Sequence, residues 1–271
     1  MKYQEFTPGE HLRAFVKCFY VCEYDTDVVF QDMACATGSM EIMFNLGNGY
    51  FQTGRDNSFN TTPRVELWGQ IIKPLQFKSL GKNKMLGIRF YPHTASMVLN
   101  DHVDQFNDHV TDFTALDSIE IGQLHEQLLN TSLLRGQIAL LEAFLVKKVY
   151  TFQKKNSKFE LVHNVITEMK HEDFTDTIQD VAFRYGISSR YLQKLFLQYT
   201  GLSPKLYFKI NRFQKSLILT SNKEESLTSI AYQSGYFDQS HFVRDFKFFT
   251  GFAPSAFDTA DSTVVLASSG R

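Results

Sequence analysis

Two short segments of the sequence place amides, hydroxyls and cations where the outer face of a helix would lie. The first segment carries Ser188, Ser189, Arg190, Gln193 and Lys194. The second segment carries Gln239, Ser240, Val243, Arg244 and Lys247. Arginine and glutamine can bond base edges in a major groove, methyl groups can contact thymine, and cations and hydroxyls can bond phosphates. These residue types predict recognition of double-stranded DNA.

The two segments belong to one pattern that occurs twice, over residues 178–207 and 227–257. Ala182 and Gly186 of the first copy match Ala231 and Gly235 of the second. After one extra residue in the second copy, four further pairs match: Leu192 with Phe242, Phe196 with Phe246, Gly201 with Gly251, and Pro204 with Pro254. A helical solenoid needs three or more units to bury a continuous core. Two copies therefore favour a paired module over a repeat array.

Each copy predicts a helix, a tight turn and a second helix. Thr177 and Asp180 have the spacing of a capping box, and Asp238 is a good N-cap for the last helix. Glycine at 186, 201 and 235 can take the left-handed backbone that ends a helix. The residues expected to face inward are apolar or aromatic: Leu192, Leu195, Phe196, Tyr199, Phe242, Phe246 and Phe249. This is the pattern of a helix-turn-helix, whose second helix can enter a major groove.

A helix of about fifteen residues is expected to join the two copies. Leu206, Ile210, Phe213 and Leu217 follow one helical face between Pro204 and Thr220. At 1.5 Å per residue this helix would be about 22 Å long. Together with the bodies of the two motifs, it could hold the two reading helices about 34 Å apart, which is one turn of B-form DNA.

These residues resemble the DNA-binding domain of the AraC/XylS family of bacterial transcription regulators. The resemblance rests on the paired A-x3-G turns, on the F-x4-G-x2-P endings of both copies and on the run GYFDQS at 235–240. Arg212 in the joining helix also matches and is counted among the expected DNA contacts. The match covers residues 157–257, over a third of the chain. It implies a seven-helix, bi-lobed domain that acts at promoters, with RNA polymerase as a partner of activators.

Length and composition set wider bounds. A chain of 271 residues suggests two domains. The net charge of −1 gives no support to DNA binding, and the second part of the chain is only weakly basic, so the hypothesis rests on the motif. Three cysteines, all in the first part, argue against a disulfide framework. No signal peptide or membrane-spanning run is seen, so we expect a cytoplasmic protein with no membrane partner.

The residue pattern of the first hundred residues is typical of a β-rich domain. Strands are expected at 15–24, 40–46, 49–53, 65–72, 75–80 and 85–90, with a hairpin at Gly47-Asn48-Gly49 and a short helix at 93–99. A polar connection at 101–114 and helices at about 116–152 follow. The polar run 153–158 is the best boundary, which gives a sandwich or barrel domain at 1–156, a helical domain at 157–257 and a disordered tail at 258–271. The predicted fold class is α+β.

The run from Trp68 to Leu99, with MEIMFNLG before it, resembles an amino-terminal domain of unknown function that often precedes this DNA-binding domain. By similarity it would be a cupin-like barrel that binds a small-molecule effector, which the sequence does not identify. In several relatives the helices that follow pair two subunits into a homodimer. The alternative, that they only pack on the barrel, is equally open.

Residues for catalysis or metal binding do not form a recognised pattern. The eight histidines lack H-x-H and H-E-x2-H spacing. Cys18 and Cys22 would share one face of a strand, where buried small hydrophobes are the simpler reading. DNA-repair methyltransferases with a similar DNA-binding domain have an active cysteine after a proline, and no cysteine here follows one. Arg89 and His93 either face a ligand or lie on the surface. No catalytic residue, metal or cofactor is expected.

Three hypotheses remain. The leading one is a sequence-specific DNA-binding transcription regulator, an activator rather than a repressor, in which an effector acts on residues 1–156. The second, from another class, is a barrel enzyme fused to a DNA-binding module. The third is an orphan regulator whose first domain only forms dimers. An apolar interior of the barrel would favour sensing, and converging histidines and carboxylates would favour catalysis.

Overall fold

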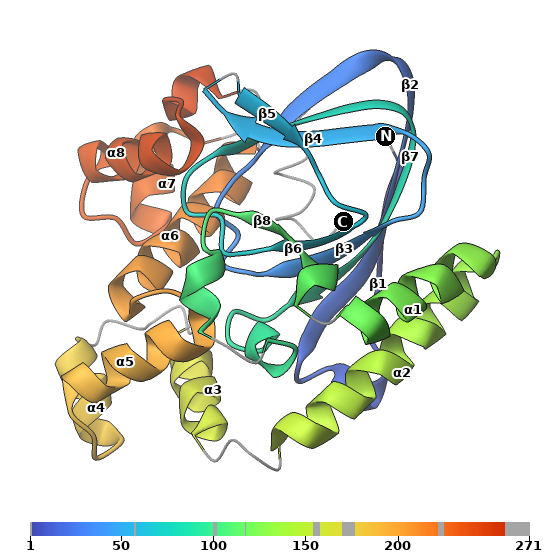
Figure 1. The fold of residues 1–271 in the computed structure, drawn as a ribbon. Coiled ribbons are helices and arrows are strands. Elements are labelled where there is room, and N and C mark those ends of the chain that lie inside the picture. Colours follow the sequence, from blue (N-terminus) through green and yellow to red (C-terminus); the bar gives the residue numbers. More distant parts are fainter. Residues whose placement is uncertain are drawn as a thin grey trace.

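The computed structural model of the chain describes residues 2–56, 58–99, 102–116, 118–153, 158–169, 177–221 and 225–257. Within these ranges a β-rich part comes first and a helical part follows, which confirms the predicted α+β class (Figure 1). The boundary proposed near residue 156 and the tail at 258–271 lie outside the described residues.

The strands form one antiparallel sheet. They are β1 (Lys2–Phe6), β2 (Val16–Ala34), β3 (Glu41–Asn45), β4 (Tyr50–Arg55), β5 (Ser58–Thr61), β6 (Val65–Trp68), β7 (Leu75–Phe90) and β8 (Val110–Asp112). The main path runs β1-β2-β7-β3-β6-β8, while β4 pairs with β7 and β5. Strand β8 lies in the segment expected to be a polar connection, and it pairs with β6 through Thr111 and Leu67.

The two longest strands, β2 and β7, pair along almost their whole length and bend together. The register shifts between Thr26 and Phe30, and Gly81, the partner of Thr26, has a φ of 79° that favours glycine. The sequence predicted two strands at 75–80 and 85–90, and this was wrong, because the chain stays paired with β2 through the bend. The bend divides the sheet into two halves.

The glycine-rich stretch at 47–49 is not the turn of a hairpin, so that prediction was also wrong. β3 pairs with residues 85–89 of β7, and β4 pairs with residues 76–80 of the same strand. The stretch therefore runs along the bend of β7. A side chain at Gly47 would place its Cβ 2.6 Å from the Lys84 backbone nitrogen. Glycine is needed here for close approach of two backbones rather than for a reversal.

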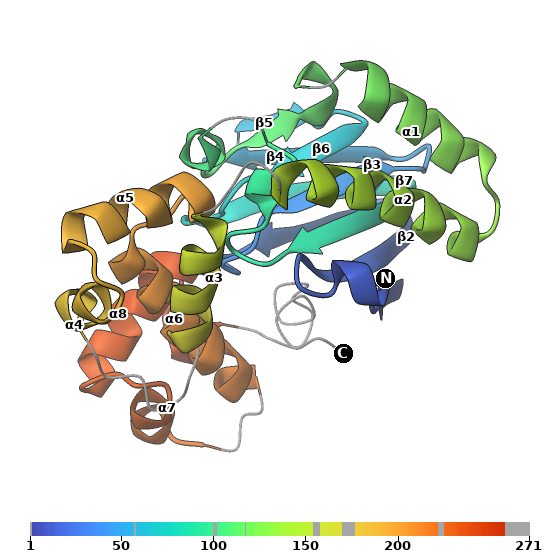
Figure 2. The same cartoon turned by 90° about the horizontal axis from the view of Figure 1, so that it is seen from below.

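Side chains of the sheet alternate between two buried clusters. Cys18, Tyr20, Cys22 and Tyr24 point between the two halves of the sheet, together with Met43, Trp68 and Met85. Phe19, Ile42, Phe44, Leu67 and Ile88 point to the opposite face. Helices α1 (Ser118–Asn130) and α2 (Leu134–Gln153) lie over that opposite face (Figure 2). The expected pair of helices at 116–152 is therefore present, whereas residues 93–99 contain only a single 3₁₀ turn, at Ala95–Met97.

The helical part follows the expected double pattern. It comprises α3 (Phe159–Glu168), α4 (Ile178–Arg184), α5 (Ser189–Thr200), α6 (Pro204–Ser221), α7 (Leu227–Gln233) and α8 (Gln239–Thr250). The described residues of this part thus contain six α-helices, where the resemblance implied seven, and a 3₁₀ turn at Pro254–Ala256 follows α8. The connecting helix α6 has 18 residues, so at 1.5 Å per residue it is about 27 Å long, more than the predicted length.

Local sequence signals explain where these helices begin and end. Thr177 and Asp180 form the predicted capping box, whose two hydrogen bonds from Thr177 lower the pKa of the Asp180 carboxyl. Ser188, Ser226 and Asp238 each accept a hydrogen bond from a backbone N–H at the start of α5, α7 and α8. Gly201 and Gly251 end α5 and α8 in the left-handed conformation.

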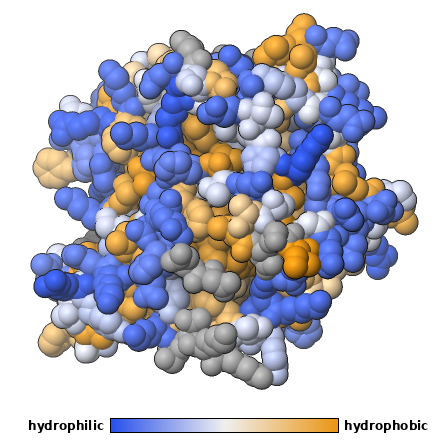
Figure 3. Space-filling view, in the orientation of Figure 1, coloured by the Kyte–Doolittle hydropathy of each residue, from blue (hydrophilic) through white to orange (hydrophobic). Residues whose placement is uncertain are grey.

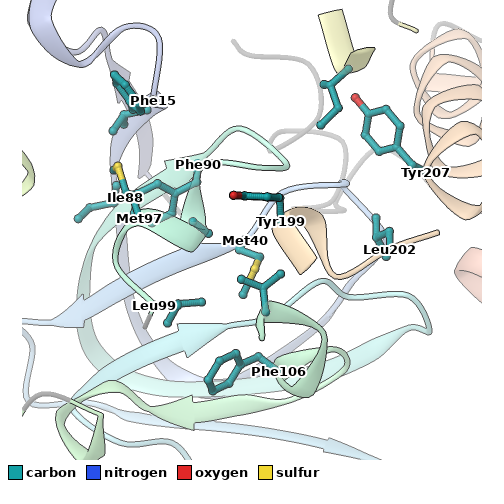
Figure 4. Close-up of a cluster of buried hydrophobic side chains, with 14 of the residues drawn as sticks. Phe15, Met40, Ile88, Phe90, Met97, Leu99, Phe106, Tyr199, Leu202 and Tyr207 are labelled. Carbon is teal, nitrogen blue, oxygen red and sulfur yellow. The ribbon is translucent and has the colours of Figure 1, made fainter. Parts of the chain in front are cut away.

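The core runs without interruption from the sheet into the helical part. Tyr199 and Leu202 of the helical part lie beside Met40 and Phe106 of the β-rich part (Figure 4). All the residues predicted to face inward on α5 and α8 are buried. Burial of large apolar side chains is worth about 1.5–3 kcal/mol each, so these contacts hold the two parts together.

This packing predicts different costs for two substitutions on α8. Phe242 is fully buried, whereas Phe248 is 44% exposed. Phe242→Ala is expected to lower the free energy of unfolding by about 3–5 kcal/mol, because the cavity cannot close fully. Phe248→Ala, the matched control, is expected to cost less than about half as much. Equal urea midpoints for the two variants would show that the inward assignment is wrong.

Candidate functional site

The outer faces of α5 and α8 form the candidate site. Both helices lie on one side of the molecule, at the left edge of Figures 1 and 2. The exposed residues on this side include Ser188, Arg190, Gln193, Lys194, Gln239, Ser240, Arg244 and Lys247. Ser189 and Val243 are half-buried, and Val243 packs against the core. The fold thus brings ten of the eleven predicted contact residues onto two solvent-facing helices.

The buried face of each helix fixes how its outer face is presented. In α5, Leu192, Leu195, Phe196 and Tyr199 are buried, which leaves Arg190, Gln193 and Lys194 toward solvent. In α8, Phe246 makes an edge-to-face contact with Phe213 of α6, with ring centroids 5.6 Å apart, which anchors the helix. At its first turn, Gln239 accepts a hydrogen bond of 2.9 Å from the Thr228 hydroxyl of α7.

Arg212, the eleventh predicted residue, has a different setting. Its guanidinium lies 5.0 Å from the ring centroid of Tyr236, and its Nη2 is 3.9 Å from Asp245 Oδ2. Its side chain is only 23% exposed. These contacts tie α6 to α8, so Arg212 has a structural role whether or not it also reaches DNA. Burial, followed by the nearby Asp245 carboxylate, raises the pKa of Tyr236.

A groove lined by cations lies between α4, α6 and α8. It includes Lys205, Lys209, Arg212, His241 and Arg244, with Asp245 as its acidic member. Lys209 Nζ is 2.9 Å from Asp245 Oδ1 and also lies over the Phe248 ring. Lys205 and Lys209 were not among the residues predicted from the sequence. The signal that could have identified them is their spacing with Arg212, at i, i+4 and i+7, because it places three cations on one face of a helix.

A second candidate site is a cavity between the two halves of the sheet, with a volume of about 130 Å³. Its walls are mainly aromatic and aliphatic, including Tyr24, Met43, Phe51, Trp68 and Phe77. Arg89, for which the sequence left two placements open, lines this cavity and is buried. His93 is also buried, but it faces α3, where its Nε2 lies 3.0 Å from His163 Nδ1.

The cysteines near this cavity are not set up as nucleophiles. Cys18, Cys22 and Cys35 are free and buried. Burial raises the pKa of Cys18 to about 12 and raises the pKa of the other two thiols as well. A thiol with a raised pKa is a poor nucleophile, because the thiolate is the reactive form. In the part of the chain that the structure describes, no group of three or more His, Cys, Asp or Glu could hold a metal ion.

Each described helix is too short or too polar to span a bilayer.

Two family models match parts of the chain. Residues 4–112 match a domain of unknown function (DUF6597), and residues 181–260 match a helix-turn-helix domain. The second match covers the α4–α5 and α7–α8 pairs.

Among curated proteins, the uncharacterized HTH-type transcriptional regulator YidL of Escherichia coli K12 is 28% identical over 146 residues, covering 51% of this chain and 48% of YidL. The HTH-type transcriptional activator RhaS of Escherichia coli K12 / DH10B is 30% identical over 115 residues, covering 41% of each protein. The chain spans about half the length of the curated relatives it matches. Among solved structures, ToxT of Vibrio cholerae matches 94% of this chain and 97% of its own, with 12% identity and a TM-score of 0.46.

The buried carboxylate of Asp245 yields a prediction about the groove. Asp245→Asn keeps the shape of the side chain but removes the charge that faces Lys209 and Arg212. We expect the free energy of unfolding to fall by about 1–3 kcal/mol, since a nearly buried charged hydrogen bond is weakened. Asp25→Asn, at an exposed position of β2, should change it by less than about 0.5 kcal/mol. Matching melting curves for the two variants would contradict this role of Asp245.

Proposed function

We propose, from the AraC-type helix-turn-helix domain that this chain carries at residues 181–260, that the protein is a sequence-specific DNA-binding regulator of transcription. The observation that supports this most is the pairing of two capped helices, α5 and α8, on one side of the molecule with their polar faces in solvent. The curated relatives named above are transcription regulators.

In this proposal α5 and α8 enter successive major grooves of one duplex. Arg190 and Arg244 would each bond a guanine, and Gln193 and Gln239 would each bond an adenine, because these pairings fit bidentate geometry. Ser188, Ser189, Lys194, Ser240 and Lys247 would bond phosphates, and Val243 would contact a thymine methyl group. The cationic groove on α6, with Lys205 and Lys209, would receive the phosphates that cross between the two helices.

The β-rich part would sense an effector and pass its presence to α6. The segment from Cys35 to Ser39 lies outside the regular strands and turns at Gly38, which has a φ of 71°, and it has contacts on two sides. Cys35, Thr37 and Ser39 line the cavity. Between them, the Ala36 carbonyl accepts a hydrogen bond from the Gln214 side chain, and Gly38 lies against Ile210. A molecule in the cavity would therefore press on a segment whose other side holds α6.

An effector can change DNA binding only if it binds the DNA-competent arrangement with a different affinity. Among the alternatives, an orphan regulator would leave the cavity empty of any ligand. A barrel enzyme is less well supported, because most of the cavity wall is apolar and the thiols Cys22 and Cys35 in it have raised pKa values. Activation through contact with RNA polymerase is our proposal for the outcome, since the relative RhaS is a transcriptional activator.

The DNA-reading proposal is tested by two arginine variants. An operator is first selected from random DNA by the purified full chain. Arg190→Ala and Arg244→Ala are each expected to weaken operator binding by about 1–3 kcal/mol, because one bidentate pair with guanine is lost. Arg135→Ala, at an exposed position of α2, is the matched control and should leave the affinity unchanged. Unchanged gel-shift titrations for both arginine variants would refute the assignment.

We also propose that helices α1 and α2 pair two copies of the chain. Ile119, Val146 and Tyr150 are exposed apolar residues near the end where Lys148 pairs with Glu120. Ile119 is 74% exposed and Tyr150 is 62% exposed. Apolar side chains grouped on a surface mark interaction sites more often than isolated ones.

Sedimentation of the full chain tests this pairing. The parent is expected to be a dimer, and Tyr150→Glu is expected to shift it to a monomer by placing a charge in the interface. Tyr232→Glu, at a position of α7 that is 64% exposed, should remain dimeric. A monomeric parent would rule out the pairing and leave these helices with the packing role alone.

A further inference from the structure

The cavity in the sheet has the size and walls of a site for one aromatic ring. Its volume of about 130 Å³ is close to that of an apolar cavity of about 150 Å³ that binds benzene. Its walls include Tyr24, Phe51, Trp68, Phe77 and Met85. On the face seen in Figure 3, hydrophobic residues gather at the centre of the molecule over the strands, and hydrophilic residues surround them.

A cluster of charged and phenolic groups forms the polar part of the cavity wall. Arg89 donates from Nε to Glu41 Oε1 at 2.7 Å and from Nη1 to Glu5 Oε1 at 2.8 Å. The hydroxyl of Tyr20 donates to Glu41 Oε2, and the hydroxyl of Tyr3 donates to Glu5. Tyr3, Tyr20, Glu41 and Arg89 all line the cavity.

The balance of charge in this cluster decides which ligands it can accept. One guanidinium faces two carboxylates, so the cluster carries a net charge of −1 when all three groups are ionised. Both tyrosine hydroxyls donate to carboxylates, and the Tyr3 hydroxyl also accepts a hydrogen bond of 3.1 Å from Arg89 Nη1. Arg89 is held between Glu5 and Glu41, so an anionic ligand would compete with these two carboxylates for the guanidinium. Carboxylate oxygens can each accept a further hydrogen bond, so the cluster is better suited to a donor.

A third carboxyl group, that of Glu66, also favours a cationic ligand over an anionic one. Glu66 is buried and accepts a 2.6 Å hydrogen bond from Nε1 of Trp68, a residue of the cavity wall. Burial raises the pKa of Glu66 to about 7. When Glu66 ionises it makes the surroundings of the cavity more negative, and when it is protonated it leaves the excess of the first cluster unchanged. In either form it does not favour an anion.

We propose that this cavity binds a small aromatic amine, with the ring among the aromatic walls and the ammonium group on Glu41. The inference rests on the proposed role of the β-rich part as a sensor, and it names the chemical class of the effector. Tyrosine and tryptophan rings also attract ammonium groups, and Tyr24 and Trp68 are part of the cavity wall. The Tyr20 ring already has the Arg89 guanidinium over it, 5.0 Å from its centroid.

The test compares three ligands of similar size on the full chain by calorimetry: benzylamine, benzyl alcohol and benzoate. We expect benzylamine to bind at least about tenfold more tightly than benzoate, a difference of about 1.4 kcal/mol, because a cluster of net negative charge attracts the ammonium group and repels the carboxylate. Benzyl alcohol should fall between them. Benzoate binding as tightly as benzylamine, or benzyl alcohol equalling it, would overturn the assignment of an ammonium site. Binding of none of the three would overturn the cavity as the site of an aromatic amine.

A variant localises the effect. Glu41→Gln makes the cluster neutral, so the preference for benzylamine over benzoate is expected to fall by about tenfold. Glu23→Gln, at an exposed position of β2, removes the same charge outside the cavity and should keep the preference of the parent. A preference that is unchanged in Glu41→Gln would contradict the inference, and the comparison on the parent chain stands even if this variant does not fold.

The outcome is separable from that of the regulator proposal. Calorimetry is done without DNA, and selection of an operator is done in parallel without ligand and with benzylamine. A chain that binds operator DNA and none of the three ligands would refute only the ligand class. A chain that binds benzylamine but no specific DNA would refute only the regulator proposal.

Discussion

Helix α6 holds α5, α8 and the β-rich part against each other. Tyr207 packs on Phe196 of α5, with ring centroids 5.9 Å apart, and Phe213 packs on Phe249 of α8 at 4.8 Å. The same helix meets the β-rich part through Gln214, which bonds the Ala36 carbonyl. Because side chains in a core pack at crystal-like density, α5 and α8 cannot shift independently while these contacts persist. The spacing and direction of the two outer faces therefore depend on α6 more than on any residue of those faces.

This arrangement also gives the cavity a direct route to the helical part. The segment 35–39 is shared, since alternate residues line the cavity and contact α6. A ligand can act here with a small displacement, because the segment is a single irregular stretch of chain that contacts both the cavity and α6. The polar cluster around Arg89 lies on β1, β2, β3 and β7, where paired strands resist movement. In this proposal the paired strands hold the ligand in place, and the shared segment 35–39 is the part that it displaces.

Local signals in the sequence predicted the helical part well, and non-local ones limited the rest. The capping box at Thr177, the glycines at the helix ends and the inward aromatic residues depend on neighbours within a few positions, so spacing alone revealed them. The prediction for the stretch 47–49 was wrong because its glycines are needed for close contact with β7, some 35 residues further along the chain. The burial of Arg89 depends on Glu5 and Glu41, which lie 84 and 48 positions away. No local sequence pattern indicates that the charge of a buried arginine is paired with carboxylates so far away along the chain. Lys205 and Lys209 could have been found from their spacing with Arg212.

The central claim is that one chain reads two successive major grooves with α5 and α8 held by α6. A methylation-protection footprint of the full chain on its selected operator tests it most directly, with the protein titrated to one chain per site. Two protected major-groove windows, centred about 10–10.5 base pairs apart on one face of the duplex, are the predicted result. A single protected window per bound chain, or two windows offset by half a helical turn, would contradict the claim.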